Sequence, residues 1–229
     1  GTHLGDQPSR RPSPVRVHVG GQGWLELADW PPPMPEQVLY LQPGGALAAA
    51  APARGGDEVF VYNPADPTPT VGGRLLSPVG GYRDDTELAR RADVLTFTGA
   101  PLPTDLCVVG APVVELSHSC TNPNNDLFVR VSQVDAQGRS RNISDGYLAS
   151  APDTGTVRLE LDAVAHSFPA GSRIRVLIAG GSHPRFVRNL GTGESVATGT
   201  ALATARHTVH LGGETRLVLP ADSRPPSTD

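Results

Sequence analysis

Residues 173–179 read Arg-Ile-Arg-Val-Leu-Ile-Ala, and this stretch decides the fold class. Ile174 and Val176 alternate with Arg173 and Arg175. Successive side chains of a β-strand point to opposite faces, so a period of two predicts a strand with one apolar face and one wet face. A sheet with one wet face is usually antiparallel.

The same alternation recurs at short intervals along most of the chain. It predicts further strands at 15–19, 38–41, 58–63, 94–98, 106–109, 113–119, 127–135, 139–144, 157–161, 207–211 and 215–219. In Leu127–Asp135 the apolar phase slips, which indicates either a β-bulge or a strand buried on both faces. So many strands with so little helix predict an all-β protein built from two packed antiparallel sheets.

Turn and helix signals agree with this prediction. Gly138 in Asp135–Gly138 suits a tight hairpin because glycine tolerates a positive φ, and Pro169–Gly171 suits a second turn. Thr86–Ala92 is the one segment that we expect to form a helix, of about two turns. The alanine-rich stretch 46–53 is compatible with helix or loop.

Bulk composition excludes several classes of function. The 229 residues include 26 Gly and 23 Pro but few aromatics, a mixture that favours short strands and turns. All 19 basic residues are scattered arginines and the net charge is −4, so we expect no nucleic-acid partner. No apolar run approaches the roughly 18 residues of a membrane helix, so we expect no membrane partner.

Cysteine and histidine patterns predict no metal or cofactor. Cys107 and Cys120 could form one disulfide, but two reduced thiols are favoured because Cys107 lies in an apolar run. His207 and His210 are three apart in an expected strand and so lie on opposite faces, which is unsuitable for a shared metal. We expect His166 to be a hydrogen-bonded core or rim histidine. Bound calcium stays open, because ligands converge only in three dimensions.

Nothing in the sequence indicates a nucleophile. An α/β-hydrolase carries its serine in a Gly-x-Ser-x-Gly elbow, and that pentapeptide does not occur here. Ser182 precedes His183, but neighbouring residues of an extended chain point apart, so a structural loop is expected. We therefore predict no catalytic residue, and no serine, histidine and carboxylate within hydrogen-bonding distance. Trp24 and Trp30 are expected in a loop that packs on the sandwich.

Charged residues in apolar surroundings predict a structural network. The members are Asp126, Asp145, Arg185, Arg188 and Asn189. Buried charges must be paired, so we expect an Asp–Arg network that pins loops at one end of the sandwich. A ligand pocket is the alternative, and the substrate-binding residues stay unknown. The acidic cluster Asp84–Glu87 is expected to be a solvated loop and helix N-terminus.

Several blocks, in a shared order, resemble the C-terminal domain of the Xaa-Pro dipeptidyl-peptidase, cocaine-esterase and α-amino-acid-ester-hydrolase family. They are residues 62–73, 91–98, 101–106, 125–126, 135–139, 143–146, 168–176 and 183–190. The resemblance implies a jelly-roll β-sandwich of the galactose-binding-domain-like kind at 15–221. It also implies an arm from an α/β-hydrolase core at 1–14, with a flexible tail at 222–229.

The same resemblance implies a role without catalysis in this chain. The expected function is that of an accessory domain, which helps to shape the active site and stabilises the hydrolase core that owns the catalytic serine. The expected partner is the α/β-hydrolase catalytic domain of the same protein, self-association is left open, and a cytoplasmic location is expected. The alternative is a free-standing module that binds carbohydrate or another ligand.

Overall fold

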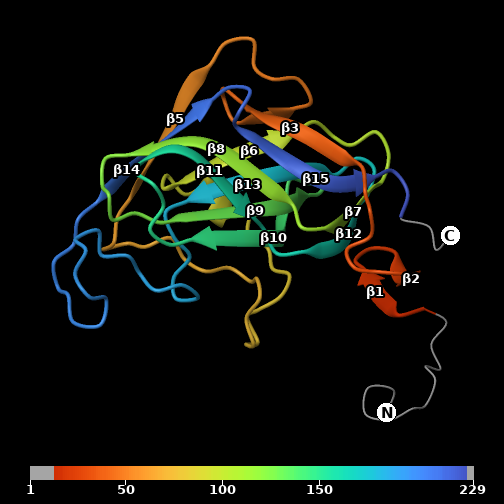
Figure 1. Ribbon diagram of the computed structural model, residues 1–229, viewed down its shortest axis with the longest axis horizontal. Coiled ribbons are helices and arrows are strands. Elements are labelled where there is room, and N and C mark those ends of the chain that lie inside the picture. The colour runs from red at the N-terminus through yellow and green to blue at the C-terminus, as the bar shows by residue number, and fades with distance from the viewer. Residues whose placement is uncertain (1–12, 226–229) are drawn as a thin grey trace.

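The computed structural model describes residues 13–225, which form a two-layer β-sandwich (Figure 1). The first strands are β1 Val15–Val19, β2 Gly23–Leu27, β3 Glu36–Gln42, β4 Ala46–Ala48 and β5 Gly56–Tyr62. After the 3₁₀ turn η1 Leu88–Arg90 come β6 Val94–Gly99, β7 Leu106–Gly110, β8 Val113–Cys120, β9 Leu127–Val134 and β10 Ser140–Leu148. The last are β11 Thr154–Glu160, β12 Val164–Phe168, β13 Arg173–Ala179, β14 Ala205–Leu211 and β15 Arg216–Asp222.

One layer has the strand order β10-β9-β13-β6, with every neighbour antiparallel. The alternation that predicted β13 is confirmed: Ile174 and Val176 are buried in the main core. Arg175 points away from that core, and its Nε donates to Thr98 Oγ1 at 2.9 Å. The period-two pattern therefore placed the core face of this strand correctly.

The other layer has the order β3-β15-β8-β14-β5, and β11 pairs with β8. Short β4 joins the layers, because it is antiparallel to β3 and parallel to β6. At one end β7 pairs with β12 and with the last residues of β15. Between β8 and β14 the chain changes layer several times: β9, β10 and β13 belong to the first layer, and β8, β11 and β14 to the second. This agrees with the all-β sandwich prediction.

The hydrophobic core lies between the two layers. Its largest side chains are Phe60, Phe97, Leu116, Phe168, Ile178 and Leu217, all at most 2% exposed. Strand β9 is also covered on its other face, where Phe128 packs with Leu88 and Leu177 in a second cluster. Burial on both faces therefore explains the slipped apolar phase of β9. The register shift lies in the neighbouring strand β10, between Asn142 and Ser144.

The predicted helix at Thr86–Ala92 is wrong, because only the 3₁₀ turn Leu88–Arg90 forms there. The start of this segment is fixed by contacts with strands β9 and β10. Ser140 N donates to Thr86 Oγ1 at 2.8 Å, and the Asp85 carboxylate is buried. The alanine-rich stretch forms the short strand β4 and then loop.

The predicted location of the two tryptophans, in a loop that packs on the sandwich, is only partly confirmed. Trp24 lies in β2 and is 63% exposed, so its expected packing on the sandwich is wrong. Arg16 covers one side of the ring, with its guanidinium 4.7 Å from the ring centroid. Trp30 does lie in a loop, and it packs against the cluster that contains Cys107 and Ala165.

Both cysteines are free, and Cys107 is fully buried, which agrees with the prediction of reduced thiols. No helix within residues 13–225 has the length and apolarity to span a membrane. Residues 1–12 and 226–229 lie outside the described part of the chain. The arm at 1–14 and the tail at 222–229 thus stay predictions, although β15 extends to Asp222.

Candidate functional site

A chain of alternating charges runs from the core to the surface around Asp145. Arg130 Nη2 on β9 lies 3.1 Å from Asp145 Oδ2 on β10, and Arg185 Nη1 lies 2.5 Å from the other carboxylate oxygen. Arg185 also faces Asp162, which pairs with Arg74 at 3.0 Å. Side-chain exposure rises along this chain, from none at Arg130 to 77% at Arg74.

Asp85 is the first member of this chain of charges, and the prediction that it lies in a solvated loop is wrong. Its side chain is fully buried, Ser132 Oγ donates to it at 2.7 Å, and Arg130 lies 3.6 Å away. Sequence reasoning missed Arg130 too, although an arginine inside the apolar run of β9 was the available signal. Buried charges need partners of opposite sign, and Arg130 has two, Asp85 and Asp145.

The other predicted members of the network do not belong to this chain of charges. Asp126 accepts hydrogen bonds from Tyr147 Oη at 2.5 Å and from Ser150 N at 2.9 Å, and it pairs with no arginine in the part of the chain that the structure describes. Arg188 donates to the Pro64 carbonyl at 3.3 Å. Asn189 Oδ1 accepts from Gly191 N at 2.8 Å. Of the five residues, the structure thus joins only Asp145 and Arg185.

A cavity of about 460 Å³ opens at the outer end of the charge chain. It combines charged side chains with apolar ones from the loop between β5 and β6, and its lining includes Arg74, Leu76, Tyr82, Asp145 and Asp162. Burial raises the pKa of Asp162, and the two neighbouring arginines oppose that rise. An ion pair beside an apolar wall is a typical composition for a recognition site.

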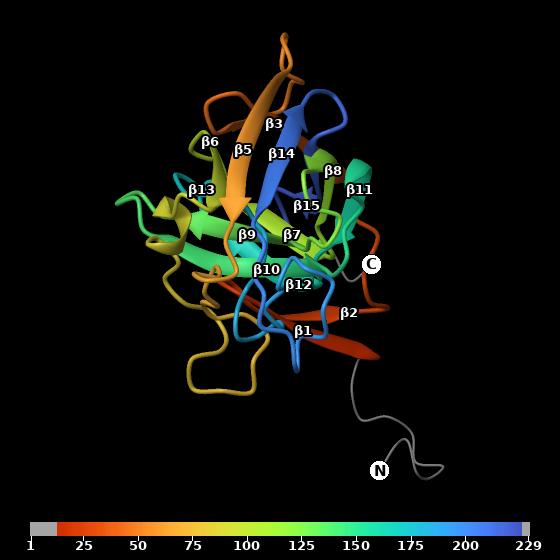
Figure 2. The same cartoon turned by 90° about the vertical axis from the view of Figure 1, so that its left-hand side faces the viewer.

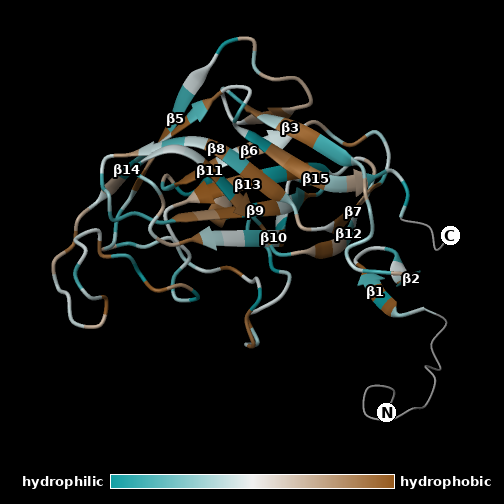
Figure 3. Cartoon of the chain, in the orientation of Figure 1, coloured by the Kyte–Doolittle hydropathy of each residue, from teal (hydrophilic) through white to brown (hydrophobic). Residues whose placement is uncertain are grey.

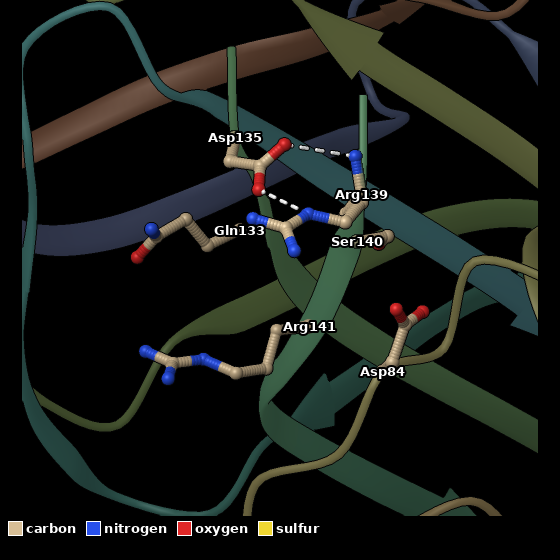
Figure 4. Close-up of a pocket in the computed structure, with 6 residues that line it drawn as sticks. All are labelled: Asp84, Gln133, Asp135, Arg139, Ser140 and Arg141. Carbon is tan, nitrogen blue, oxygen red and sulfur yellow. Dashed lines mark hydrogen bonds and ion pairs between the residues drawn. The ribbon is translucent and has the colours of Figure 1, made fainter. Parts of the chain in front are cut away.

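A second cavity, of about 300 Å³, lies beside the turn between β9 and β10 (Figure 4). The predicted tight hairpin is present here, with Gly138 at φ +84°. Asp135 Oδ2 accepts from Arg139 Nε, and Oδ1 accepts from the Arg139 amide, each at 2.9 Å. Figure 4 shows both contacts, which satisfy this carboxylate inside the hairpin itself. We therefore interpret the Asp135–Arg139 pair as part of the turn.

The expectation that no serine, histidine and carboxylate would meet is wrong. Ser119 Oγ on β8 lies 2.9 Å from His210 Nε2 on β14, and His210 Nδ1 lies 2.7 Å from Asp57 Oδ1 on β5. The order of groups is that of a serine hydrolase relay. The histidine and carboxylate are 42% and 59% exposed, however, and the serine sits within a regular strand. The two cavities described above are lined by other residues.

Three other histidines, His118, His166 and His207, are buried and hydrogen-bonded inside the protein. His207 is buried on the core side of β14, opposite to His210 as predicted, and its Nδ1 lies 3.0 Å from His118 Nε2. Burial lowers the pKa of His207 to about 3. His166 is buried, as expected of a core histidine, and is hydrogen-bonded to Gln133 at 2.7 Å. Within residues 13–225 no group of three or more potential ligand residues could hold a metal ion.

Ser182 and His183 behave as a structural loop. The Ser182 hydroxyl is buried and lies 3.0 Å from Thr70 Oγ1, while its carbonyl accepts from the same threonine hydroxyl at 2.8 Å. The His183 amide donates to the Thr68 carbonyl at 2.9 Å. These bonds hold the segment after β13 against the segment after β5.

Comparisons with known proteins give one consistent picture. Residues 9–219 match the family model of the X-Pro dipeptidyl-peptidase C-terminal non-catalytic domain. The chain is 28% identical to the cocaine esterase of Rhodococcus sp. (strain MB1 Bresler), over 92% of this chain and 42% of that protein. The fold is similar to an α-amino acid ester hydrolase (TM-score 0.79, 23% identity, 91% and 41% covered). It is equally similar to an aminopeptidase from a Thaumarchaeota archaeon (TM-score 0.80, 24% identity, 95% and 42% covered).

These matches define the class as a non-catalytic β-sandwich domain. The chain belongs to the family of X-Pro dipeptidyl-peptidase C-terminal non-catalytic domains. It spans about two fifths of the length of the cocaine esterase and of the two solved structures. In such relatives the domain follows a catalytic domain. The resemblance stated from the sequence blocks is thus confirmed.

Proposed function

We propose that this chain is an accessory domain of a serine hydrolase, which packs against a catalytic α/β-hydrolase domain and helps to shape its active site. One observation carries the proposal: exposed apolar side chains lie on three segments that project from one side of the sandwich. These are the β1–β2 hairpin, the loop between β5 and β6, and the loop between β13 and β14, which lie on the lower side in both orthogonal views and are spread along the long axis in Figure 1 (Figures 1 and 2).

Of the eight large apolar side chains that are exposed within residues 13–225, seven belong to these three segments. They are Trp24, Leu76, Val79, Tyr82, Val187, Val196 and Leu202, and we call the side of the sandwich that carries them the apolar end. Figure 3 shows the apolar tip of the loop between β5 and β6. Scattered exposed apolar residues are ordinary on soluble proteins, but exposed apolar residues that lie mostly on one side are typical of an interaction surface.

The loop between β5 and β6 is held rigidly at its base. Gly73 and Gly81 pair through two backbone hydrogen bonds of 2.8 and 2.9 Å. Asn142 Oδ1 accepts from Arg83 N at 2.6 Å, and Asn142 Nδ2 donates to the Gly81 carbonyl at 3.1 Å. A preformed projection loses little conformational entropy on binding. This rigidity supports a role in which Leu76 forms a fixed part of a neighbouring surface.

The occupant of the apolar end is best assigned to a catalytic domain of the same protein. More than half of each relative lies outside the region that this chain matches, and the family domain follows the catalytic domain. Strand β1, the first described strand, belongs to the β1–β2 hairpin, which is one of the three segments (Figure 1). A domain that precedes β1 would therefore reach the apolar end over a short path.

A role in shaping the active site is supported by the cavity beside Leu76. The exposed loop and the charge chain meet there, so a catalytic domain docked on the apolar end would close the cavity into a shared pocket. Arg74 and Asp162 would then line that pocket with fixed charges, and Leu76 with an apolar wall. Serine chemistry would come from the docked domain, because the cavity contains no serine–histidine pair.

The test uses a longer protein that joins this chain to the hydrolase domain encoded before it. Leu76→Asp together with Val79→Asp is expected to reduce kcat/KM for 4-nitrophenyl esters at least tenfold and to increase proteolysis between the domains. Val61→Asp is the matched control, because Val61 is exposed on β5 outside the apolar end. Equal activity of all three proteins would contradict the proposal.

Two outcomes would support a different function. If the isolated chain is a dimer by sedimentation and Leu76→Asp makes it monomeric, the apolar end joins two copies of this chain. If the isolated chain binds glycans and Trp24→Ala abolishes that binding, the free-standing module is the better description. In the proposed case the isolated chain shows neither behaviour.

A further inference from the structure

The relay of Ser119, His210 and Asp57 lies outside the apolar end. It is built on β8, β14 and β5, and in Figure 2 the strands β5 and β14 extend toward the end opposite to the three projecting segments. His210 and Asp57 are directly opposed across β14 and β5. A catalytic domain docked on the apolar end would thus leave this face of the sheet accessible.

The hydrogen bonds of the relay determine where the protons lie when the imidazole is neutral. An ionised carboxylate only accepts hydrogen bonds, so His210 Nδ1 must carry the proton that faces Asp57. His210 Nε2 is then a bare acceptor, and the Ser119 hydroxyl donates to it at 2.9 Å. This is the arrangement in which a histidine can withdraw the serine proton as an acyl group is attacked.

We propose that Ser119 is an activated hydroxyl, made nucleophilic by His210 and Asp57, which accepts an acyl group from small activated esters. Ser119 Oγ attacks the ester carbonyl carbon, and the new C–O bond forms as the bond to the leaving phenolate breaks. The serine proton passes to His210 Nε2 and from there to the phenolate. The products are an acylated Ser119 and a free phenol.

The surroundings limit which acyl donors can react. The relay lies on an exposed sheet face. Beside it, on the same face of β5 and β14, a cavity of about 730 Å³ is lined by residues that include Val59, Val61 and Arg206. Thr208 is directly opposed to Ser119 across β8 and β14, and its side chain lies on the same face. Its hydroxyl is a donor that can contact the developing oxyanion, but one donor is weaker than an oxyanion hole. Esters with good leaving groups are therefore the expected acyl donors.

The test treats the 229-residue chain with 4-nitrophenyl acetate and with phenylmethanesulfonyl fluoride, and maps the adducts by mass spectrometry. Both reagents are expected to label Ser119 first. The sulfonyl adduct is included because it does not turn over in water. Ser117 is the internal control, because it lies on the same face of β8 and its hydroxyl has no hydrogen bond to His210 in the structure.

Variants separate activation from simple exposure. His210→Gln is expected to slow the labelling of Ser119 about tenfold or more, in line with the loss of a general base. Asp57→Asn should slow the labelling of Ser119 by a smaller factor. Thr208→Val should slow the reaction of Ser119 with 4-nitrophenyl acetate. Equal labelling of Ser117 and Ser119, or labelling of Ser119 that is unchanged in His210→Gln, would overturn the inference. Neither result bears on the docking proposal, which rests on a different face.

Discussion

Arg130 Nη2 and Asp145 Oδ2 lie 3.1 Å apart inside the sandwich, and neither side chain is more than 2% exposed. Asp145 also pairs with Arg185, and this ion pair holds the loop after β13 against the sheet. The guanidinium of Arg130 also lies 5.2 Å from the centroid of Phe128 in the second cluster. One buried arginine thus joins the core to the base of the candidate site.

Arg130→Met is expected to lower the free energy of unfolding by about 3–5 kcal/mol, because it removes the cation that faces buried Asp85 and one of the two cations that face Asp145. Urea denaturation followed by tryptophan fluorescence measures this change. Arg139→Met is the control, since its ion pair with Asp135 is exposed and should matter little. Similar midpoints for the two variants would refute the structural role of Arg130.

Gly73→Ala is expected to disrupt the Asp145–Arg185 pair. A Cβ at Gly73 would collide with the Arg185 guanidinium and lie 2.9 Å from Asp145 Oδ2. Gly81→Ala is a matched control, because Gly81 has a similar positive φ but open space around its Cβ position. Both variants incur the strain of a left-handed alanine, and Gly73→Ala should lose about 2 kcal/mol more. Thermal unfolding compares them, and equal losses would mean that the ion pair moves freely.

Asp126 and Tyr147 are expected to be energetically coupled. Burial raises the pKa of Tyr147, as does its hydrogen bond to the Asp126 carboxylate, so the phenol stays a donor. Asp126→Ala, Tyr147→Phe and the double variant form a cycle in which we expect a coupling energy of about 1–3 kcal/mol. Additive effects in denaturant unfolding would show that the hydrogen bond contributes nothing beyond packing.

Stability is expected to fall in acid through the buried histidines. Burial lowers the pKa of His207 to about 3 and that of His166 to about 4, so the folded protein holds both rings neutral. The unfolded chain binds protons near pH 6.5, and folded stability is therefore complete above that pH and is lost progressively toward pH 3. His207→Gln keeps a hydrogen-bonding side chain beside His118 but cannot titrate. Its stability should change less between pH 7 and pH 4 than that of the unmodified protein, and parallel profiles would contradict this assignment.

The strands were predictable because their signal is local. Each face of β13 or β14 could be assigned from two or three side chains, and the opposite placement of His207 and His210 followed from the same rule. The helix at Thr86–Ala92 failed for a non-local reason. Asp85 at its start is bound to Arg130 and Ser132, which are distant in the sequence, and those contacts outweigh a weak helical propensity.

Of the candidate site, the sequence indicated charged residues in apolar surroundings but not their partners. Asp145 and Arg185 are 40 residues apart and do meet, whereas Asp126 finds a tyrosine and a backbone amide instead of an arginine. Arg130 had a visible signal, a charge inside an apolar run, but its partners lie on different segments. Pairing across strands depends on register, and no local pattern encodes the register between distant strands.

The sequence by itself determined the all-β class, the faces of most strands and the family, because these depend on local periodicity and on the order of short blocks. Only the tertiary structure decided which charges pair, where the exposed apolar side chains gather, and that Ser119, His210 and Asp57 come together. The physical reason is that each of these depends on residues that are separated in the sequence and brought together by the fold. Asp145 and Arg185 are 40 positions apart, and the contacts of His210 with Ser119 and Asp57 span 91 and 153 positions.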